Sequence, residues 1–363
     1  MDAARDPPGS SPAARWRGYG RAALTLGLLL LGAVLLVRHL RSVDWVAMRA
    51  VMAQLPQESL LVAGLLAAAS YATYCSFDLL GRRATGHPLD RMRVLSIGFV
   101  GHACALNLGP AGAGVRLRLY TRQGMPAHLS AALWLFNVAT NWLGFILLAG
   151  VALTTRLFAL PTRWGLAHTP LQGVGIALLA LVALYLLACH AWHDRSTVVR
   201  GVEFRLPQLS VAALQCGLSL LNWLLLSGIV YVLLRERAPF GDVLGAIMTS
   251  ALALAVIDVP AGLGILETVF LTLLGSRIPT HELLGGLMAY RAIYFVGPLL
   301  LASAVYLALE WDAHNRKEGN RSGAGHRATG TSDALTGRPQ SRDEHSPQLA
   351  TGAPRPRSHR PSG

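Results

Sequence analysis

Four charged side chains lie within apolar stretches of the sequence, namely Asp78, Asp258, Glu267 and Arg291. An ionisable group costs free energy in lipid, so each of these residues is a candidate for binding a ligand. The three carboxylates suit a cationic group, and Arg291 suits a phosphate or a pairing with Asp258 or Glu267. The alternative is that they form salt bridges that only fix neighbouring helices, or that Asp78 simply marks the membrane interface.

Two short motifs rich in Pro and Gly interrupt apolar segments, Pro110–Gly114 and Pro260–Gly264. Broken helices expose backbone groups, which at membrane depth must be buried in protein or line a wet cavity. We therefore expect the glycines of both motifs to line a binding site. The simpler interpretation is that Pro and Gly only kink ordinary spans or help helices to pack. The glycines concerned are Gly112, Gly114, Gly262 and Gly264.

Polar residues also flank the first break. Arg116 and Arg118 follow it, and planar guanidinium groups match the oxygens of a phosphate. The alternative for both is the ordinary positive charge of a cytoplasmic loop. His102 and Asn107 precede the break and could line the same cavity.

The apolar segments that must position these residues are long. Six run without a break, near 22–37, 59–80, 129–154, 171–191, 209–234 and 283–309. Each is about long enough to cross the hydrocarbon core, whereas two further segments, near 94–125 and 243–275, contain the breaks. Charged residues make up only 14% of the chain and the mean hydropathy is +0.43. The sequence therefore predicts an all-α polytopic membrane protein.

Both ends of the chain are polar. Residues 1–20 and 311–363 contain few large apolar residues and cannot bury a core. We therefore expect a membrane domain over 21–310, preceded by a disordered N-terminus and followed by a disordered basic tail.

Arginines after the second and fourth unbroken spans favour the cytoplasm for both loops. They are Arg82, Arg83, Arg91 and Arg93, and then Arg195, Arg200 and Arg205. Both loops can be cytoplasmic if each broken segment returns to the face from which it entered, the first from the cytoplasm and the second from the opposite side. Both termini are then cytoplasmic. If each broken segment crosses twice instead, the chain has ten spans with the same end locations.

The two halves of the membrane region repeat three motifs in order. Pro110–Gly114 corresponds to Pro260–Gly264. Further matches are Pro126-Ala-His128 with Pro279-Thr-His281, and Gly144–Gly150 with Gly297–Ser303, at offsets of 150, 153 and 153 residues. With the orientation above, the halves, roughly 59–155 and 209–309, have opposite topology. Inverted repeats with interrupted helices are a recurring transporter design.

Other classes of function lack a signature. The chain has no Gly-x-Ser-x-Gly, His-Glu-x-x-His or P-loop motif, and its four cysteines form no Cys-x-x-Cys pair. We therefore expect no catalytic residue, no cofactor and no metal site. The formal charge of +13 comes from arginines beside apolar segments and in the tail, which suits anionic lipid and not nucleic acid.

Several motifs together resemble the lysylphosphatidylglycerol synthetase transmembrane (flippase-like) family. Leu108–Tyr120 looks like its Gly-rich "VRYRLY" segment, Val259–Glu267 resembles its "PGGLGxFE" motif, and Ala289–Tyr294 is similar to its "AYRxIYY" segment. Asp78 at the end of a Tyr-rich helix also fits. The resemblance covers about 60–310.

This resemblance implies a bacterial inner-membrane protein that moves a lipid between leaflets. Bifunctional members carry a C-terminal domain that makes the lipid, and the short stretch after Glu310 indicates the stand-alone branch. The expected cargo is a phospholipid or lipid-linked headgroup, and a separate lipid synthase or a second copy of the chain would be a partner. The alternatives are an accessory subunit of a lipid-modifying enzyme and, less favoured, an integral-membrane lipid transferase.

Overall fold

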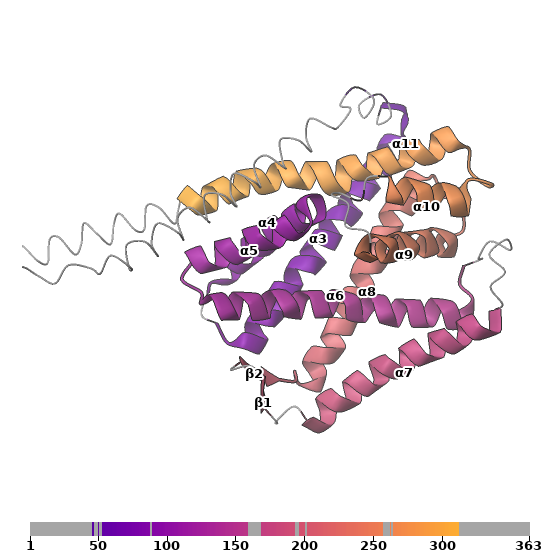
Figure 1. Ribbon diagram of the computed structural model, residues 1–363. Helices are drawn as coiled ribbons and strands as arrows, with labels where there is room; N and C mark the ends of the chain where they lie inside the picture. The colour runs from indigo at the N-terminus through magenta and orange to yellow at the C-terminus, as the bar shows by residue number, and fades with distance from the viewer. Residues whose placement is uncertain are drawn as a thin grey trace, which may run out of the picture. The chain divides into compact units, whose positions relative to one another are not determined.

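Five long apolar helices form the frame of the protein in the computed structural model (Figure 1). They are α3 (Gln57–Thr85), α6 (Ala127–Thr155), α7 (His168–Trp192), α8 (Leu209–Leu233) and a last helix over Thr280–Trp311. All five are long and apolar enough to cross a membrane, which confirms five of the six predicted spans. The protein is a polytopic α-helical membrane protein.

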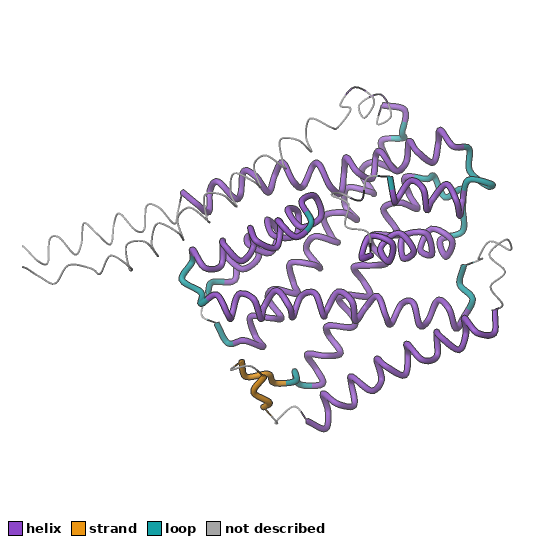
Figure 2. The backbone as a smooth tube through the Cα atoms, in the orientation of Figure 1, coloured by secondary structure: helices purple, strands orange, loops and turns teal. Residues whose placement is uncertain are grey.

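The structure describes residues 53–87, 89–158, 168–192, 196–199, 202–256, 262 and 264–311, together with Val46 and Ala50. The predicted span at 22–37, the N-terminal segment 1–20 and the tail after Trp311 lie outside these residues, as does Asp258. Between α7 and α8 the chain forms a short antiparallel pair, β1 (Ser196–Val199) and β2 (Val202–Arg205), which the sequence did not predict (Figure 2).

The first broken segment folds as a helical hairpin. Helix α4 (Arg91–Leu108) ends at Gly109, and α5 (Pro110–Arg122) starts directly after it. Gly109 has φ 56°, a left-handed conformation that favours glycine and turns the chain. A Cβ on Gly112 would run into the backbone at Ala105, so the small residue lets the two legs approach closely.

The second broken segment contains α9 (Phe240–Val256) and α10 (Ile265–Leu274). Asp242 near the start of α9 forms an ion pair with Arg277 just after α10, which holds the open ends of the two legs together. The hairpin α4–α5 and the pair α9–α10 lie toward opposite ends of the bundle in Figure 1.

The legs of both hairpins are short. They contain 18, 13, 17 and 10 residues in α4, α5, α9 and α10. At about 1.5 Å per residue they reach roughly 27, 20, 26 and 15 Å. Each is shorter than the hydrocarbon core of about 30 Å.

Both hairpin tips contact the middle of the last helix. Asn107, next to the first tip, donates from Nδ2 to the carbonyl oxygen of Phe295 at 3.2 Å. Arg291 donates from Nη2 to the carbonyl oxygen of Gly262 in the second break at 3.1 Å. These two positions on the last helix are four residues apart, or about 6 Å along its axis.

The last helix changes its hydrogen-bond pattern at this place. After α11 (Thr280–Tyr290) it forms the π-helical turn η3 (Arg291–Val296) and then returns to α-helix. Pro298 gives the reason, because it has no N–H for the carbonyl four residues earlier and its ring clashes with that group. That carbonyl belongs to Tyr294, and it accepts a bond of 3.1 Å from the Tyr71 hydroxyl instead.

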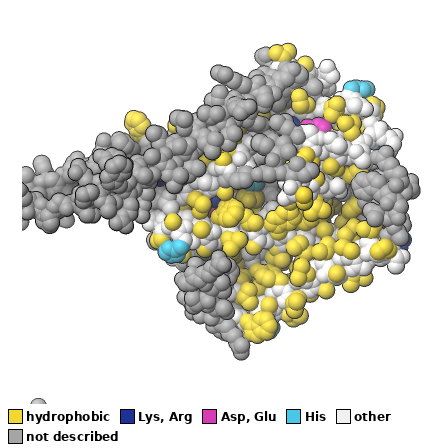
Figure 3. Space-filling view, viewed as in Figure 1, with side chains coloured by type: hydrophobic (Ala, Val, Ile, Leu, Met, Phe, Trp, Pro, Cys, Tyr) yellow, Lys and Arg dark blue, Asp and Glu magenta, His cyan; other side chains and the backbone are white. Residues whose placement is uncertain are grey.

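The outer surface of the helices suits a lipid environment. In the view of Figure 3, hydrophobic side chains cover most of the described surface. Exposed apolar residues lie on all five long helices and are most numerous on α7, which carries Ile176, Leu184 and Leu187 among others. Polar side chains such as Asp78, Asn137 and Asn222 are buried inside the bundle instead.

Candidate functional site

Asp78 is the centre of a buried cluster near one end of the bundle. Its carboxylate, which has no exposed surface, accepts from the Arg116 guanidinium on Oδ2. Its Oδ1 accepts from the Tyr120 hydroxyl at 3.0 Å and from Asn137 Nδ2 at 2.9 Å. Helices α3, α5 and α6 each contribute to this cluster, so one carboxylate ties the first hairpin to two spanning helices.

Two glycines of α4 make room for the ion pair. A Cβ on Gly98 would lie 2.5 Å from Asp78 Oδ2, and one on Gly101 would lie 3.0 Å from the Arg116 side chain. The Arg116 guanidinium lies 5.9 Å from the centre of the Tyr74 ring. Arg116 is therefore enclosed by a carboxylate, an aromatic ring and the α4 backbone.

A second cluster of polar side chains adjoins the Asp78 cluster and extends toward the middle of the last helix. The Tyr74 ring stacks on His102, with centroids 3.5 Å apart, and His102 Nε2 lies 3.3 Å from the Tyr294 hydroxyl. The Tyr294 hydroxyl also lies 3.0 Å from Ser70 Oγ. Ser70 in turn donates to Asn222 Oδ1 of α8 at 2.7 Å. This chain of contacts runs from α4 to the last helix, then to α3 and on to α8.

The second break holds its own ion pair. Arg291 donates from Nε to Glu267 Oε1 at 2.8 Å and from Nη2 to Oε2 at 3.0 Å, a bidentate arrangement. Glu267 Oε2 also accepts from the backbone N–H of Gly264, which has φ 82° and precedes α10. The Glu267 side chain is 23% exposed, whereas that of Arg291 is 8% exposed. The Glu267 carboxylate is therefore the more exposed member of the pair.

The open end of the first hairpin is tied to the end of the last helix. Arg118 Nε lies 3.1 Å from Glu310 Oε1, and Arg122 lies 3.7 Å from Glu310 Oε2. The Tyr306 hydroxyl donates to the same carboxylate at 3.2 Å. The last helix thus contacts the first hairpin both at its tip, through Asn107, and at its open end.

The structure brings most of the predicted site residues into two groups. Asp78 and Arg116 pair in one, and Glu267, Arg291, Gly262 and Gly264 meet in the other. Asn107 of α4 joins neither group but donates to the Phe295 carbonyl of the last helix, and Arg118 pairs with Glu310. Gly112 packs against α4, Gly114 has no atom within 4 Å of a Cβ built on it, and Asp258 lies outside the described residues.

Sequence reasoning missed several members of these groups. Tyr120, Asn137, Tyr294 and Glu310 bind the predicted residues directly. A signal for Asn137 was present, since an amide in the middle of an apolar span has the same need for a partner as a charge. Tyr120 and Tyr294 end two of the motifs that carry the family resemblance, but their residue type alone does not indicate a partner.

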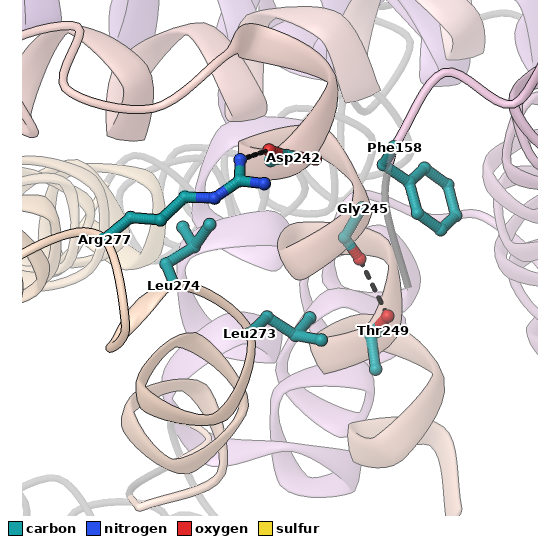
Figure 4. Close-up of a pocket in the computed structure, with 7 residues that line it drawn as sticks. All are labelled: Phe158, Asp242, Gly245, Thr249, Leu273, Leu274 and Arg277. Atoms are coloured by element: carbon teal, nitrogen blue, oxygen red, sulfur yellow. Dashed lines mark hydrogen bonds and ion pairs between the residues drawn. The ribbon is translucent and has the colours of Figure 1, made fainter. Parts of the chain in front are cut away.

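A small pocket lies away from both groups, with a volume of about 30 Å³ (Figure 4). It is lined by Phe158, Asp242, Gly245, Thr249, Leu273, Leu274 and Arg277. The Asp242–Arg277 ion pair crosses one side of it, and Thr249 donates to the Gly245 carbonyl at 2.8 Å. This volume suits about one water molecule and not a lipid headgroup.

Fold and site together define a class of protein. It is a polytopic α-helical membrane protein in which two interrupted segments bring ion pairs into the bundle, and their tips contact one π turn of the last helix. Residues 23–302 match the family described as the lysylphosphatidylglycerol synthase TM region. The chain belongs to this family.

Two relatives are similar over most of their length. The chain is 35% identical over 309 residues to "Inner membrane protein YbhN" of Escherichia coli, covering 84% of this chain and 97% of that protein. It is 30% identical over 260 residues to "Uncharacterized protein slr0712" of Synechocystis, covering 70% of this chain and 80% of that protein.

Proposed function

We propose that the chain is a lipid flippase of the bacterial inner membrane, which moves a phospholipid or a lipid-linked headgroup between the leaflets. The observation that carries this proposal is the position of the hairpin tips. Asn107 and Gly262, from two different breaks, contact the last helix at Phe295 and Arg291, four residues apart. Two breaks that meet deep in the bundle provide polar groups for a headgroup while acyl chains stay in the bilayer.

We propose further that the two halves, 59–155 and 209–309, form an inverted repeat, the arrangement that this mechanism uses. Each hairpin is followed by a spanning helix with the same start, because Pro126 precedes α6 and Pro279 precedes α11 with nearly the same backbone angles. The φ and ψ values are −57° and 141° at Pro126, and −54° and 137° at Pro279. One leg of each hairpin, α5 with 13 residues and α10 with 10, is too short to cross the membrane, which favours re-entrant hairpins over ten spans.

The proposed orientation places both termini in the cytoplasm. The open end of α4–α5 then faces the cytoplasm together with Arg118, Arg122 and Glu310. Hairpin α9–α10 opens to the other side, where Arg237 and Glu282 form an ion pair of 2.6 Å. This orientation gives the cytoplasmic side the loops with Arg82, Arg83, Arg91 and Arg93.

The charged groups are paired with each other in this conformation. Transport would exchange these internal partners for a ligand, so that Glu267 binds a cationic group and Arg291 binds a phosphate. Asp78, Arg116 and Arg118 would take part on the cytoplasmic side in the same way. Such an exchange costs less than exposing a bare charge, because each group has a partner in both states. The lipid crosses chemically unchanged, and we propose no catalytic residue.

Purified protein reconstituted into liposomes with fluorescent phospholipids tests the proposal. Dithionite bleaches only the outer leaflet, so the fraction that becomes accessible with time measures transfer between leaflets. We expect faster transfer of at least one lipid class than in protein-free vesicles. No acceleration for any lipid class would overturn the flippase. Chemical conversion of a labelled lipid would instead indicate a transferase, and acceleration only with an added lipid synthase would indicate an accessory subunit.

A further inference from the structure

Two side chains from the first half of the chain donate hydrogen bonds to backbone carbonyls in the π turn of the last helix. The Tyr71 hydroxyl on α3 donates to the Tyr294 carbonyl at 3.1 Å. Asn107 Nδ2 on α4 donates to the Phe295 carbonyl at 3.2 Å. Neither bond touches a side chain of the last helix, so their effect is on its backbone.

Pro298 removes the donor that the Tyr294 carbonyl would have in an α-helix. In a regular α-helix the Tyr294 carbonyl would accept from the N–H of residue 298, and proline has none. A buried carbonyl without a donor costs free energy. The Tyr71 hydroxyl donates to this carbonyl, and Tyr71 is itself buried. In the π turn, the Tyr71 hydroxyl therefore serves as a donor to a carbonyl that a backbone N–H would serve in an α turn.

The π turn sets the direction in which the Arg291 side chain points around the helix axis. A turn with i→i+5 bonds holds one more residue than an α turn. One residue in an α-helix corresponds to a rotation of about 100° and a rise of about 1.5 Å. Both ends of the last helix are fixed by ion pairs, Glu282 with Arg237 and Glu310 with Arg118. A change from π to α must therefore turn the middle of the helix.

We propose that Tyr71 and Asn107 are positioning residues for Arg291. By holding the last helix in its π form, they direct the Arg291 guanidinium toward Glu267 and Gly262. The first half of the chain thereby controls the ion pair of the second break, although none of its residues is needed to form that pair. This inference deepens the proposed function, and its meaning for transport rests on that function.

The experiment measures the coupling between Glu267 and Arg291 in different backgrounds. Glu267→Gln and Arg291→Gln are made singly and together, and the midpoint of thermal unfolding is measured in lipid nanodiscs. In the wild-type background we expect the double variant to lose much less than the sum of the two single losses. In a Tyr71→Phe, Asn107→Leu background we expect this difference to fall by more than half.

Tyr185→Phe is the matched control. It also removes a tyrosine hydroxyl that donates to a buried group, here Gln215 Oε1 at 2.8 Å, but it lies on α7 away from the last helix. The coupling should be unchanged in this background. A general loss of stability would lower every midpoint and leave the coupling intact, so the coupling separates positioning from a purely structural role.

An unchanged coupling in the Tyr71→Phe, Asn107→Leu background would overturn the inference. If that double background yields no folded protein, Tyr71→Phe alone carries the test, because it removes one oxygen and keeps the ring. Pro298→Ala provides an independent arm, since it restores an N–H for the Tyr294 carbonyl and should also reduce the coupling. Because no lipid transfer is measured, a failed flippase assay leaves this result standing, and a failed coupling test leaves the flippase standing.

Discussion

The two hairpins carry ion pairs of the same chemistry in opposite surroundings. In the first, Asp78 and Arg116 are buried, and two further side chains donate to the carboxylate. In the second, Glu267 and Arg291 form a bidentate pair whose carboxylate is 23% exposed. Among the described residues, helices surround the first pair and leave almost none of it exposed. The second pair lies at the start of the short helix α10.

This difference in burial indicates which ion pair is structural and which can bind a ligand. Breaking a fully buried pair leaves an uncompensated charge, which costs about 3–5 kcal/mol. In the second pair only Arg291 is buried, and the partly exposed Glu267 carboxylate can be reached by a ligand without first opening the bundle. We therefore expect the Asp78–Arg116 pair to hold the first hairpin in place and the Glu267–Arg291 pair to exchange with a ligand first.

The largest effect should follow removal of the Asp78 charge. In Asp78→Asn, the Arg116 guanidinium loses its counter-ion in a buried place, so we expect a loss of about 3–5 kcal/mol in stability. The measurement is thermal unfolding and the yield of monodisperse protein in detergent. Asp78→Asn combined with Arg116→Met removes both charges and should recover a large part of the loss. No recovery would mean that the pair acts mainly through its hydrogen bonds and not through its charge.

A smaller effect should come from crowding the first pair without changing its charge. A Cβ on Gly98 would lie 2.5 Å from Asp78 Oδ2, and Asp78 cannot retreat because three donors hold it. We expect Gly98→Ala to cost about 1–3 kcal/mol, the usual range for overpacking. Gly114→Ala in the same hairpin is the control.

Gly114 tests a prediction made from the sequence alone. Nothing lies within 4 Å of a Cβ at this position, and the residue is helical. Gly114→Ala should therefore leave stability unchanged or raise it by about 0.5–1 kcal/mol. If Gly114→Ala slows lipid transfer without destabilising the protein, Gly114 lines the path of the ligand. If transfer is unchanged, its small size serves neither packing nor binding.

The second pair should show the reverse balance of stability and transport. Glu267→Gln keeps the shape of the side chain and a carbonyl acceptor, and Glu267 is the partly exposed member of the pair, so we expect a smaller loss of stability than for Asp78→Asn, about 1–3 kcal/mol. The rate of lipid transfer should fall about ten- to a hundredfold, because a charge-assisted hydrogen bond to a ligand is worth about 1.5–3 kcal/mol. Parallel unfolding and transfer assays check both. Equal losses in the two assays would make this pair structural, like the first.

Much of the architecture could be predicted from the sequence because lipid imposes a simple rule. Long apolar runs predicted α3, α6, α7, α8 and the last helix, and all five are confirmed. Pro and Gly motifs predicted where the two short-legged segments break. The β1–β2 pair was missed, because four-residue strands in a polar loop leave no periodic signal.

The pairing of charges was predicted only in part. Arg291 was expected to pair with Asp258 or Glu267, and Glu267 is confirmed as a partner. Arg116 and Arg118 were considered for binding a phosphate, and in the structure they pair with Asp78 and Glu310. These contacts join residues 38 and 192 positions apart, so only the packing of helices decides them.

The smallest effect should be a pH dependence confined to the open end of the first hairpin. His87 lies just after α3, with both ring nitrogens buried and without a hydrogen-bond partner among the described residues. Burial, together with the nearby Arg82, lowers the pKa of His87 below its ordinary value. The ring also packs against Tyr120 of the Asp78 cluster, with centroids 6.2 Å apart.

A lowered pKa sets the sign of this effect. The unfolded chain binds the proton at a higher pH than the folded protein, so stability is full above about pH 6.5 and falls as the pH drops toward the folded value. We expect the unfolding midpoint of the wild type to fall by about 1–2 °C more than that of His87→Phe between pH 7.5 and pH 5.5. Phe keeps a ring against Tyr120 and cannot titrate. Equal falls in the two proteins would show that His87 takes up its proton as easily in the folded protein as in the unfolded chain. The first hairpin would then be open to water at this end, and its resistance to exchange would come from the Asp78 pair alone.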